Sequence, residues 1–405
     1  MKCEKYIKAV TVLLCTVLSF LLSGCKGDVE VSWKVENHPV KKVLPVLKVY
    51  IENSGSMDGY MCEGSELKDA VYDYASSVSS YSSATYLSYI NSQVVPYEGS
   101  LRSFVRDLTP SAFRAVSGNR ANSDLGDMLQ RILAATDKNT VSIFISDCIL
   151  DVPQGKASNY FINRQIDLKN AFLKKLVKDS NFGVEIIQLE SRFTGNYYGT
   201  DGTTSLTNEQ RPYYIWVMGD KKVLAYLNRH IALSKIKHGY RNIASFATCS
   251  DISYDLFNSY LKGVENNRDG AKKMSLKSVR GGDYELTIKV DLYPTLIDDV
   301  TLAKPSIFKT KNDFVKVMRV EPIEDESYSH LLTVRIESCA KSSGEILRLV
   351  PQPVPLWVEQ SNDKTGMNIR RNLNKTSGIK YIVGGIADAY SEQKERANIK
   401  FTIKE

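Results

Sequence analysis

Histidine and cysteine, the usual protein ligands of zinc, are scarce in this chain of 405 residues. Its 4 histidines lie far apart in the sequence, and none of its 7 cysteines belongs to a Cys-x-x-Cys pair. Structural zinc sites usually draw their ligands from such closely spaced pairs. The sequence therefore argues against a zinc protein.

The sequence also lacks the short motifs of several large enzyme classes. It contains neither the phosphate-binding loop GxxxxGK[ST] nor the dinucleotide fingerprint GxGxxG. The nucleophile elbow Gly-x-Ser-x-Gly fails around Ser56, because Ser54 and Asp58 stand where glycine is required. None of the histidines lies in a catalytic motif. We therefore expect a protein that is not an enzyme.

Charge of one sign is not concentrated anywhere in the chain. The 53 basic and 46 acidic residues give a net charge of +7, and they are spread along the sequence. No basic stretch is interleaved with aromatic residues, so nucleic acid is a poor candidate for a partner. Hydrophobic residues make up 43% of the chain, which supports well-buried cores in two or three domains.

The first residues have the layout of a secretory leader. Lys2, Lys5 and Lys8 precede an apolar run at residues 9–22. This run is shorter than the roughly 20 residues of a membrane-spanning helix. The Leu-Ser-Gly-Cys sequence that follows resembles a bacterial lipobox, which implies a signal peptide at residues 1–24 and lipidation of Cys25. The alternatives are a plain signal peptide with an incidental cysteine, or an uncleaved anchor.

The residues after the lipobox indicate where the protein is anchored. Lys26 stands where an aspartate would resemble an inner-membrane retention signal, so we expect the outer membrane. Residues 25–30 also resemble the charged export signals of Bacteroidetes lipoproteins, which leaves the periplasmic and the external side open. Residues 25–42 show no sustained hydrophobic period and are interpreted as a tether.

Residues 43–235 show the alternation of strand and helix patterns that is typical of an α/β domain. Strands alternating with helices predict a Rossmann-like, mostly parallel sheet flanked by helices. Residues 192–209 are rich in Gly, Thr, Asn and Tyr and are interpreted as a surface insertion. The expected strands are 43–51, 84–90, 140–145, 183–189 and 213–218, and the expected helices are 66–80, 123–136 (with Ser123 as N-cap), 165–178 and 220–231.

Hard oxygen ligands follow two of these strands and open one helix. Residues 51–57 read Ile-Glu-Asn-Ser-Gly-Ser-Met and leave the first strand. In α/β sheets, ligands bind at the carboxyl ends of the strands. Carboxylate and hydroxyl oxygens suit Mg²⁺, Mn²⁺ or Ca²⁺ rather than zinc or copper. The candidate metal ligands are Glu52, Ser54, Ser56, Ser123 and Asp147.

In this order, the ligands resemble the metal-ion-dependent adhesion site (MIDAS) of a von Willebrand factor A (VWA) domain. The family pattern is Asp-x-Ser-x-Ser, then a threonine that opens a helix, then an aspartate that closes a later strand. Ser54 and Ser56 match the pattern, and Ser123 keeps the hydroxyl of the threonine that it replaces. Glu52 replaces the first aspartate, and its extra methylene moves the oxygens by more than about 1 Å, comparable with the tolerance of an octahedral Mg²⁺ shell.

The resemblance implies binding without catalysis. Serine hydroxyls would hold the ion directly, the carboxylates would act largely through water, and a carboxylate from a partner protein would complete the shell. The alternatives for the longer Glu52 are that it displaces a water, weakens the site, shifts it toward Ca²⁺ or leaves it empty. An inert remnant is therefore the alternative to a working Mg²⁺, Mn²⁺ or Ca²⁺ site.

Four cysteines remain after the leader and the lipidation site. By the resemblance, Cys62 and Cys148 should lie on the same rim as the metal ligands. A disulfide between them, or between Cys249 and Cys339, is permitted in an oxidising compartment but is not shown by the sequence. Two free thiols are the alternative, because a disulfide needs Cα atoms within about 7 Å.

The second half of the chain carries no motif of known chemistry. Residues 236–273 are polar with helical pieces and are interpreted as a connector. Residues 274–405 are expected to form a β-rich (α+β) domain, because the hydrophobic period changes to two. Near the end, a helix at 376–395 and a last strand at 398–403 are expected, the strand returning to a sheet.

Together these features predict a non-enzymatic, lipid-anchored protein of the cell envelope. It would bind a protein partner with an exposed acidic residue through a metal-assisted site. One alternative is a scaffold subunit of an envelope complex with a vestigial metal site. A metal-assisted hydrolase using Glu52 and Asp58 is the other. The identity of the partner and the oligomeric state are left open.

Overall fold

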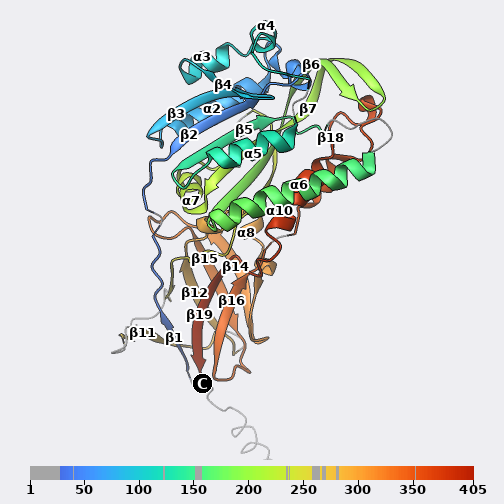
Figure 1. Ribbon diagram of the computed structural model, residues 1–405. Helices are drawn as coiled ribbons and strands as arrows, with labels where there is room; N and C mark the ends of the chain where they lie inside the picture. Colours follow the sequence, from blue (N-terminus) through green and yellow to red (C-terminus); the bar gives the residue numbers. More distant parts are fainter. Residues whose placement is uncertain are drawn as a thin grey trace, which may run out of the picture.

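The computed structural model shows a mixed α/β protein with several sheets, in two parts. One part is a helix-flanked sheet, and the other is a pair of β-sheets without flanking helices (Figure 1). The predicted signal peptide and Cys25 lie outside the described residues. These are residues 28–39, 41–121, 124–150, 157–233, 236, 238–257, 265–266, 271–279, 282–351 and 353–405.

The α/β part is built on a seven-stranded mixed sheet in the order β4-β3-β2-β5-β7-β6-β8. Strand β2 is parallel to both of its neighbours, β3 and β5, and every other pair in the sheet is antiparallel. The expectation of a mostly parallel sheet is therefore wrong. The strands are β2 (Val46–Glu52), β3 (Ala84–Ile90), β4 (Val94–Tyr97), β5 (Thr140–Ser146), β6 (Phe182–Gly199), β7 (Gly202–Asp220) and β8 (Tyr240–Phe246).

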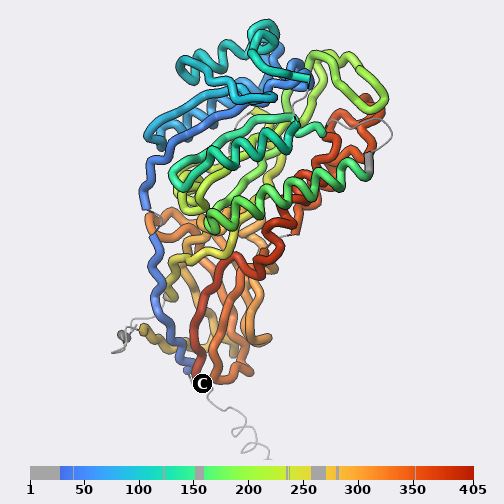
Figure 2. Tube along the Cα trace, in the orientation of Figure 1, coloured from blue at the N-terminus to red at the C-terminus, as the bar shows by residue number. Residues whose placement is uncertain are grey.

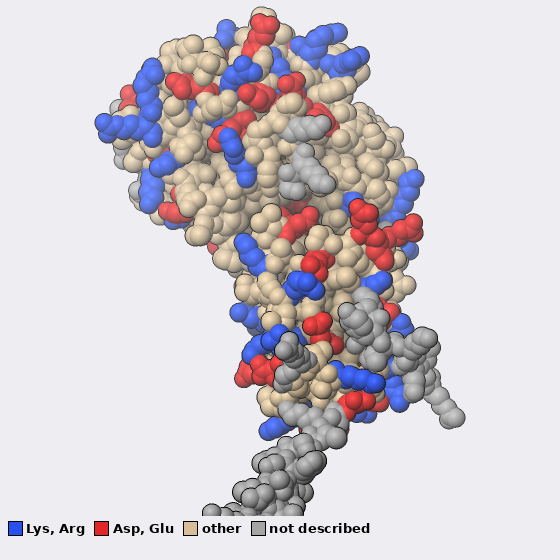
Figure 3. Space-filling view, turned by 180° about the vertical axis from the view of Figure 1, so that it is seen from behind, with Lys and Arg blue, Asp and Glu red and all other residues tan. Residues whose placement is uncertain are grey.

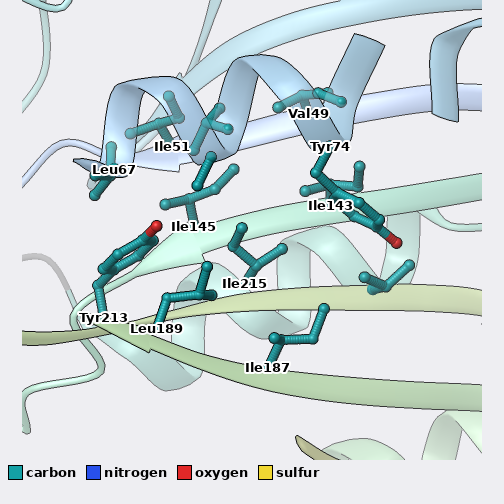
Figure 4. Packing of buried hydrophobic residues seen from close by; sticks show 14 of the residues in the cluster. Val49, Ile51, Leu67, Tyr74, Ile143, Ile145, Ile187, Leu189, Tyr213 and Ile215 are labelled. Atoms are coloured by element: carbon teal, nitrogen blue, oxygen red, sulfur yellow. The ribbon is translucent and has the colours of Figure 1, made fainter. Parts of the chain in front are cut away.

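Helices cover both faces of this sheet. On one face, Leu67 and Tyr74 of α2 point toward a continuous layer of sheet residues, which includes Ile51, Ile143 and Ile215 (Figure 4). The opposite face packs against α5, α6 and α10. The helices of this part are η1 (Ser56–Met61), α2 (Glu66–Ser79), α3 (Leu101–Arg106), α4 (Pro110–Arg114), α5 (Leu125–Ala135), α6 (Ala157–Lys178) and α7 (Lys221–His230).

Strands β6 and β7 form one long hairpin that reaches beyond the body of the sheet. The two strands are paired from Phe182↔Asp220 to Gly199↔Gly202, with one bulge between Phe193 and Gly195. Residues 192–209, which we expected to be a surface insertion, are therefore the outer half of this hairpin. Gly202 turns the chain with a φ of +115°, which an L-residue rarely adopts.

The second part consists of two antiparallel sheets that enclose a common core. Alternating burial along β12 and β19 matches the predicted period of two. The strands of these two sheets are β1 (Val29–Lys34), β9 (Tyr254–Phe257), β10 (Glu265–Asn266), β11 (Ala271–Leu276), β12 (Tyr284–Val290), β13 (Phe308–Lys309), β14 (Val315–Pro322), β15 (His330–Ile336), β16 (Ser343–Leu349) and β19 (Ala397–Lys404). Short helices η3 (Tyr293–Thr295), α8 (Asp299–Leu302) and η4 (Pro305–Ile307) connect them.

Strand β1 corrects the predicted tether. It pairs with β11 on one side and with β19 on the other, so residues 29–34 belong to a sheet (Figure 1). The connector at 236–273 is also corrected, because its described residues form β8, β9, β10 and the start of β11 instead of helical pieces.

The chain returns to the α/β part before it ends (Figure 2). Helix α10 lies beside α6, and its buried face joins the core of that part. Strand β19 then goes back to the second part, between β1 and β16, which confirms that the last strand returns to a sheet. Residues 274–405 are therefore not one separate unit. The returning segment contains α9 (Leu356–Gln360), β17 (Asn362–Asp363), η5 (Ile369–Arg371), β18 (Thr376–Ser377) and α10 (Ile379–Ala389).

Candidate functional site

Four of the five predicted metal ligands are brought together at the carboxyl ends of β2 and β5. Glu52 is the last residue of β2, and Asp147 directly follows β5. The two strands are parallel neighbours, with Ile51 paired to Ile145, so their ends meet. Ser54 lies in the turn that leads from β2 into η1, and Ser56 is the first residue of η1.

Polar interactions connect four of the five candidates. The hydroxyl groups of Ser54 and Ser56 are hydrogen-bonded to each other at 3.0 Å. Ser54 also lowers the pKa of the Glu52 carboxyl, and Ser56 lowers the pKa of the Asp147 carboxyl. The structure thus brings Glu52, Ser54, Ser56 and Asp147 together in one cluster. The fifth candidate, Ser123, lies outside the described residues.

The two carboxylates of the cluster are almost completely buried, Glu52 being 5% and Asp147 1% exposed. Burial raises the pKa of both, and the charge of Asp147 raises the pKa of Glu52 further. Hydrogen bonds offset part of this effect, including one of 2.5 Å that Ser146 Oγ donates to Glu52 Oε2. The pair therefore favours a bound proton or cation over two bare negative charges.

Asp147 has an oxygen without a partner. Its Oδ1 accepts a hydrogen bond from the backbone N–H of Ile149 at 3.2 Å. Its Oδ2 is buried and has no hydrogen-bond partner among the described residues. Buried carboxylate oxygens are almost always satisfied, and an orphan of this kind needs an explanation such as an ion or a water. The donor set fits a hard cation, which Glu52, Ser54, Ser56 and Asp147 would hold.

The cluster opens into a cleft of about 710 Å³. This volume lies in the range of ligand-binding clefts, about 300–1,000 Å³. The half-exposed Tyr198, from the outer part of β6, forms one wall and lies against Gly55. The lining residues are Glu52, Ser54, Gly55, Ser56, Asp58, Arg120, Ala121, Asp124, Leu125, Ile149, Leu150, Tyr160 and Tyr198.

Arg120 is a site residue that the sequence did not reveal. Its Nη2 donates to the backbone carbonyl of Ser54 at 2.9 Å and also pairs with the carboxylate of Asp58. Arg114 pairs with the same carboxylate at 3.0 Å. Through these contacts the two arginines hold the Ser54–Ser56 turn. Both pair with the carboxylate of Asp58, whereas the hydrolase alternative would need that carboxylate to be free. No motif marks Arg120, because its position depends on the fold of residues 98–121.

The N-cap of helix α5 lies one residue later in the chain than the sequence predicted. Asp124, not Ser123, is the N-cap of α5, and its Oδ1 accepts from the backbone N–H groups of Gly126 and Asp127. Asp124 Oδ2 also pairs with Arg164 at 2.6 Å. Aspartate and serine are about equally good caps, so the capping preference alone could not decide between them.

Buried Arg211 connects Asp147 to the returning C-terminal segment. Its Nη1 donates to the backbone carbonyls of Leu373 and Lys375, each at 3.0 Å. Its charge lowers the pKa of Asp147, which offsets part of the effect of burial. The surroundings of Asp147 therefore depend on residues more than 150 positions after Glu52, which no local pattern could indicate.

The four cysteines among the described residues, Cys62, Cys148, Cys249 and Cys339, are all free. Cys148 is buried, and its sulfur lies 3.3 Å from Trp216 Nε1. Cys62 faces the carbonyl of Arg192 instead, at 3.7 Å. The possible Cys62–Cys148 and Cys249–Cys339 disulfides are thus not formed, and the site is not stiffened by a covalent link.

Comparisons with known proteins do not identify the chain. No protein-family model matches it, and no curated protein sequence matches it either. Within the described ranges, no helix is long and apolar enough to cross a membrane. The same residues hold no group of three or more His, Cys, Asp or Glu placed as metal ligands. A cation at the cluster would therefore depend on the serine hydroxyls as well as on the two carboxylates.

Proposed function

We propose that this protein binds a protein partner through a divalent cation held at the Glu52–Asp147 cluster. The observation that carries the proposal is the orphan Asp147 Oδ2, buried beside a cleft that Glu52, Ser54 and Ser56 line. A cation would neutralise the carboxylate pair and satisfy the orphan oxygen. It would also attract an acidic group of the partner.

The residues of the site would divide this work. Ser54 and Ser56 would hold a Mg²⁺, Mn²⁺ or Ca²⁺ ion through their hydroxyl groups, and Glu52 and Asp147 would supply negative charge. The bound ion would supply a positive centre for a carboxylate of the partner. Arg120 keeps the turn in place through the carbonyl of Ser54. This arrangement follows the VWA resemblance and remains non-catalytic.

We also propose that the chain is a lipoprotein of the outer membrane, anchored at Cys25. Strand β1 begins at Val29, so only residues 26–28 would separate the lipid from the folded protein. Three residues span at most about 10 Å, much less than the tether expected from the sequence. The second part would therefore lie close to the membrane. The cleft lies at the carboxyl ends of β2 and β5 and would face away from it.

Two other functions remain as alternatives. In a scaffold subunit of an envelope complex, the cluster would be vestigial and a shared proton would replace the cation. A metal-assisted hydrolase would need a free carboxylate near the ion, but two arginines pair with Asp58. On the face shown in Figure 3, basic and acidic residues are interspersed, which fits the expectation that nucleic acid is not the partner.

The Ser54→Ala substitution tests the role of the turn. We expect it to weaken Mn²⁺ binding by about 10-fold or more, because a direct ligand should matter at least as much as the outer-shell partners of metal sites. The measurement is the rise in melting temperature of EDTA-treated protein on addition of Mn²⁺. Ser80→Ala, which removes an exposed hydroxyl bonded only to the carbonyl of Ser76, is the matched control. An equal Mn²⁺ response in both variants would favour the scaffold alternative.

A further inference from the structure

A second cleft, of about 700 Å³, lies where the two parts of the molecule meet. It is at the amino ends of β2, β5 and β6, at the opposite edge of the sheet from the first cleft. Residues 37–39, 41 and 249–251, together with Pro294, close it from the other side. It is lined by Asn37, His38, Pro39, Lys41, Val43, Lys138, Asn139, Asn181, Asp220, Lys221, Lys222, Val223, Cys249, Ser250, Asp251 and Pro294.

The wall of this cleft contains a buried ammonium group. Lys221, at the start of α7, is 3% exposed. Its Nζ donates to Thr248 Oγ1 at 2.9 Å and to the backbone carbonyls of Thr248 and Cys249. All three acceptors are neutral, and no carboxylate of the described residues forms an ion pair with it. Burial accordingly lowers the pKa of this lysine. The charges of Asp220 and Asp251 offset part of this effect, but neither carboxylate forms an ion pair with the ammonium group. A buried charge that is not directly paired is costly, so an additional anion would stabilise this site.

Three further lysines surround the same cleft. Lys41, Lys138 and Lys222 are exposed, and within the described part of the chain none of their ammonium groups has an ion-pair partner. The acidic lining residues are Asp220 and Asp251, so the lining carries two more positive than negative side chains. Asp220 is already used as the N-cap of α7. The cleft therefore has an unbalanced positive charge beside amide side chains.

We propose that this second cleft binds a small, soluble, phosphate-bearing molecule. Lysine ammonium groups act as point charges and are common phosphate ligands, whereas planar recognition of a carboxylate favours arginine, which is not among the lining residues. The positive end of α7 adds to the field. Asn139 and Asn181 offer hydrogen-bonding groups for the remainder of the molecule. This second cleft shares no lining residue with the first cleft, which contains Glu52, Ser54 and Ser56 of the Glu52–Asp147 cluster.

Calorimetric titration of pyrophosphate into the full protein tests this proposal, with EDTA present so that no metal carries the anion. We expect saturable binding that the double charge reversal Lys138→Glu/Lys222→Glu weakens by about 10-fold or more, since it removes two attractions and adds two repulsions. Lys309→Glu/Lys400→Glu makes the same charge change on exposed lysines outside the cleft and should leave the affinity unchanged.

Several outcomes would overturn the proposal. Absence of saturable binding would do so, as would equal weakening in both double variants, which would indicate attraction to net charge only. Citrate binding as tightly as pyrophosphate would contradict the choice of phosphate. Retention on phosphatidylglycerol vesicles that Lys138→Glu/Lys222→Glu abolishes, without any binding of pyrophosphate, would assign the cleft to a lipid headgroup instead of a soluble molecule.

Discussion

Replacing Glu185 by glutamine should stabilise the protein at pH 8 and have little effect at pH 4.5. Glu185, on β6, is buried, and burial raises the pKa of its carboxyl from 4.5 to about 8. Among the described residues, its only hydrogen-bond partner is the amide of Asn228, whose Nδ2 donates at 2.6 Å. The folded protein therefore holds a proton that the unfolded chain releases above pH 4.5.

The sign of the effect follows from this difference in bound protons. Because the folded state binds more protons between pH 4.5 and about 8, the free energy of unfolding of the wild type falls across this window. At 1.36 kcal/mol per pH unit, the largest loss is about 5 kcal/mol at pH 8. Glutamine does not ionise, so the variant should escape this loss.

Urea unfolding of the wild type and Glu185→Gln at several pH values measures this difference. Glu190→Gln is the control on the same strand, because Glu190 is paired with Arg241 at the surface and should contribute less than about 1 kcal/mol. A difference between wild type and Glu185→Gln that is the same at pH 4.5 and pH 8 would contradict the assigned pKa.

Replacing Arg229 by alanine should strongly destabilise the junction between the two parts. Arg229, on α7, pairs with Asp291 at 2.7 Å, and the Asp291 side chain is only 1% exposed. Its guanidinium also donates to the carbonyl of Glu326 at 3.1 Å and lies over the ring of Tyr293. Removal of one partner leaves a buried charge uncompensated, which costs about 3–5 kcal/mol.

The contrast with an exposed arginine makes this prediction specific. Arg241→Ala removes a surface ion pair with Glu190 and should cost less than about 1 kcal/mol. Chemical unfolding followed by far-UV circular dichroism gives both values. If Arg229→Ala costs no more than Arg241→Ala, the ion pair with Asp291 does not hold the two parts together.

Local patterns in the sequence were sufficient to predict most of the helices and strands that position the Glu52–Asp147 cluster. The buried run that ends at Glu52 and the one that ends at Ser146 were both predicted as strands, and the structure confirms them. Since both were expected to end at the same edge of the sheet, the meeting of Glu52 and Asp147 could be predicted too. Metal binding itself stays a prediction.

The parts that could not be predicted depend on contacts between distant segments. Strand β1 pairs with β19, from the other end of the chain, so nothing near residue 30 indicates it. The β6–β7 hairpin places β7 between β5 and β6, which makes the sheet mixed although the order of strands and helices suggested parallel crossovers. Arg120 and Arg211 reach the site through such long-range packing, and no spacing rule marks them.

Calorimetric titration of Mg²⁺, Mn²⁺ and Ca²⁺ into the EDTA-treated protein tests the central claim most directly. The proposed function predicts saturable binding of one ion per chain, with protons released as the buried carboxylates give up the proton that they share. The Asp147→Asn variant should lose this binding. Absence of binding of all three cations to the folded wild-type protein would contradict the account and make the Glu52–Asp147 pair a vestigial, protonated cluster.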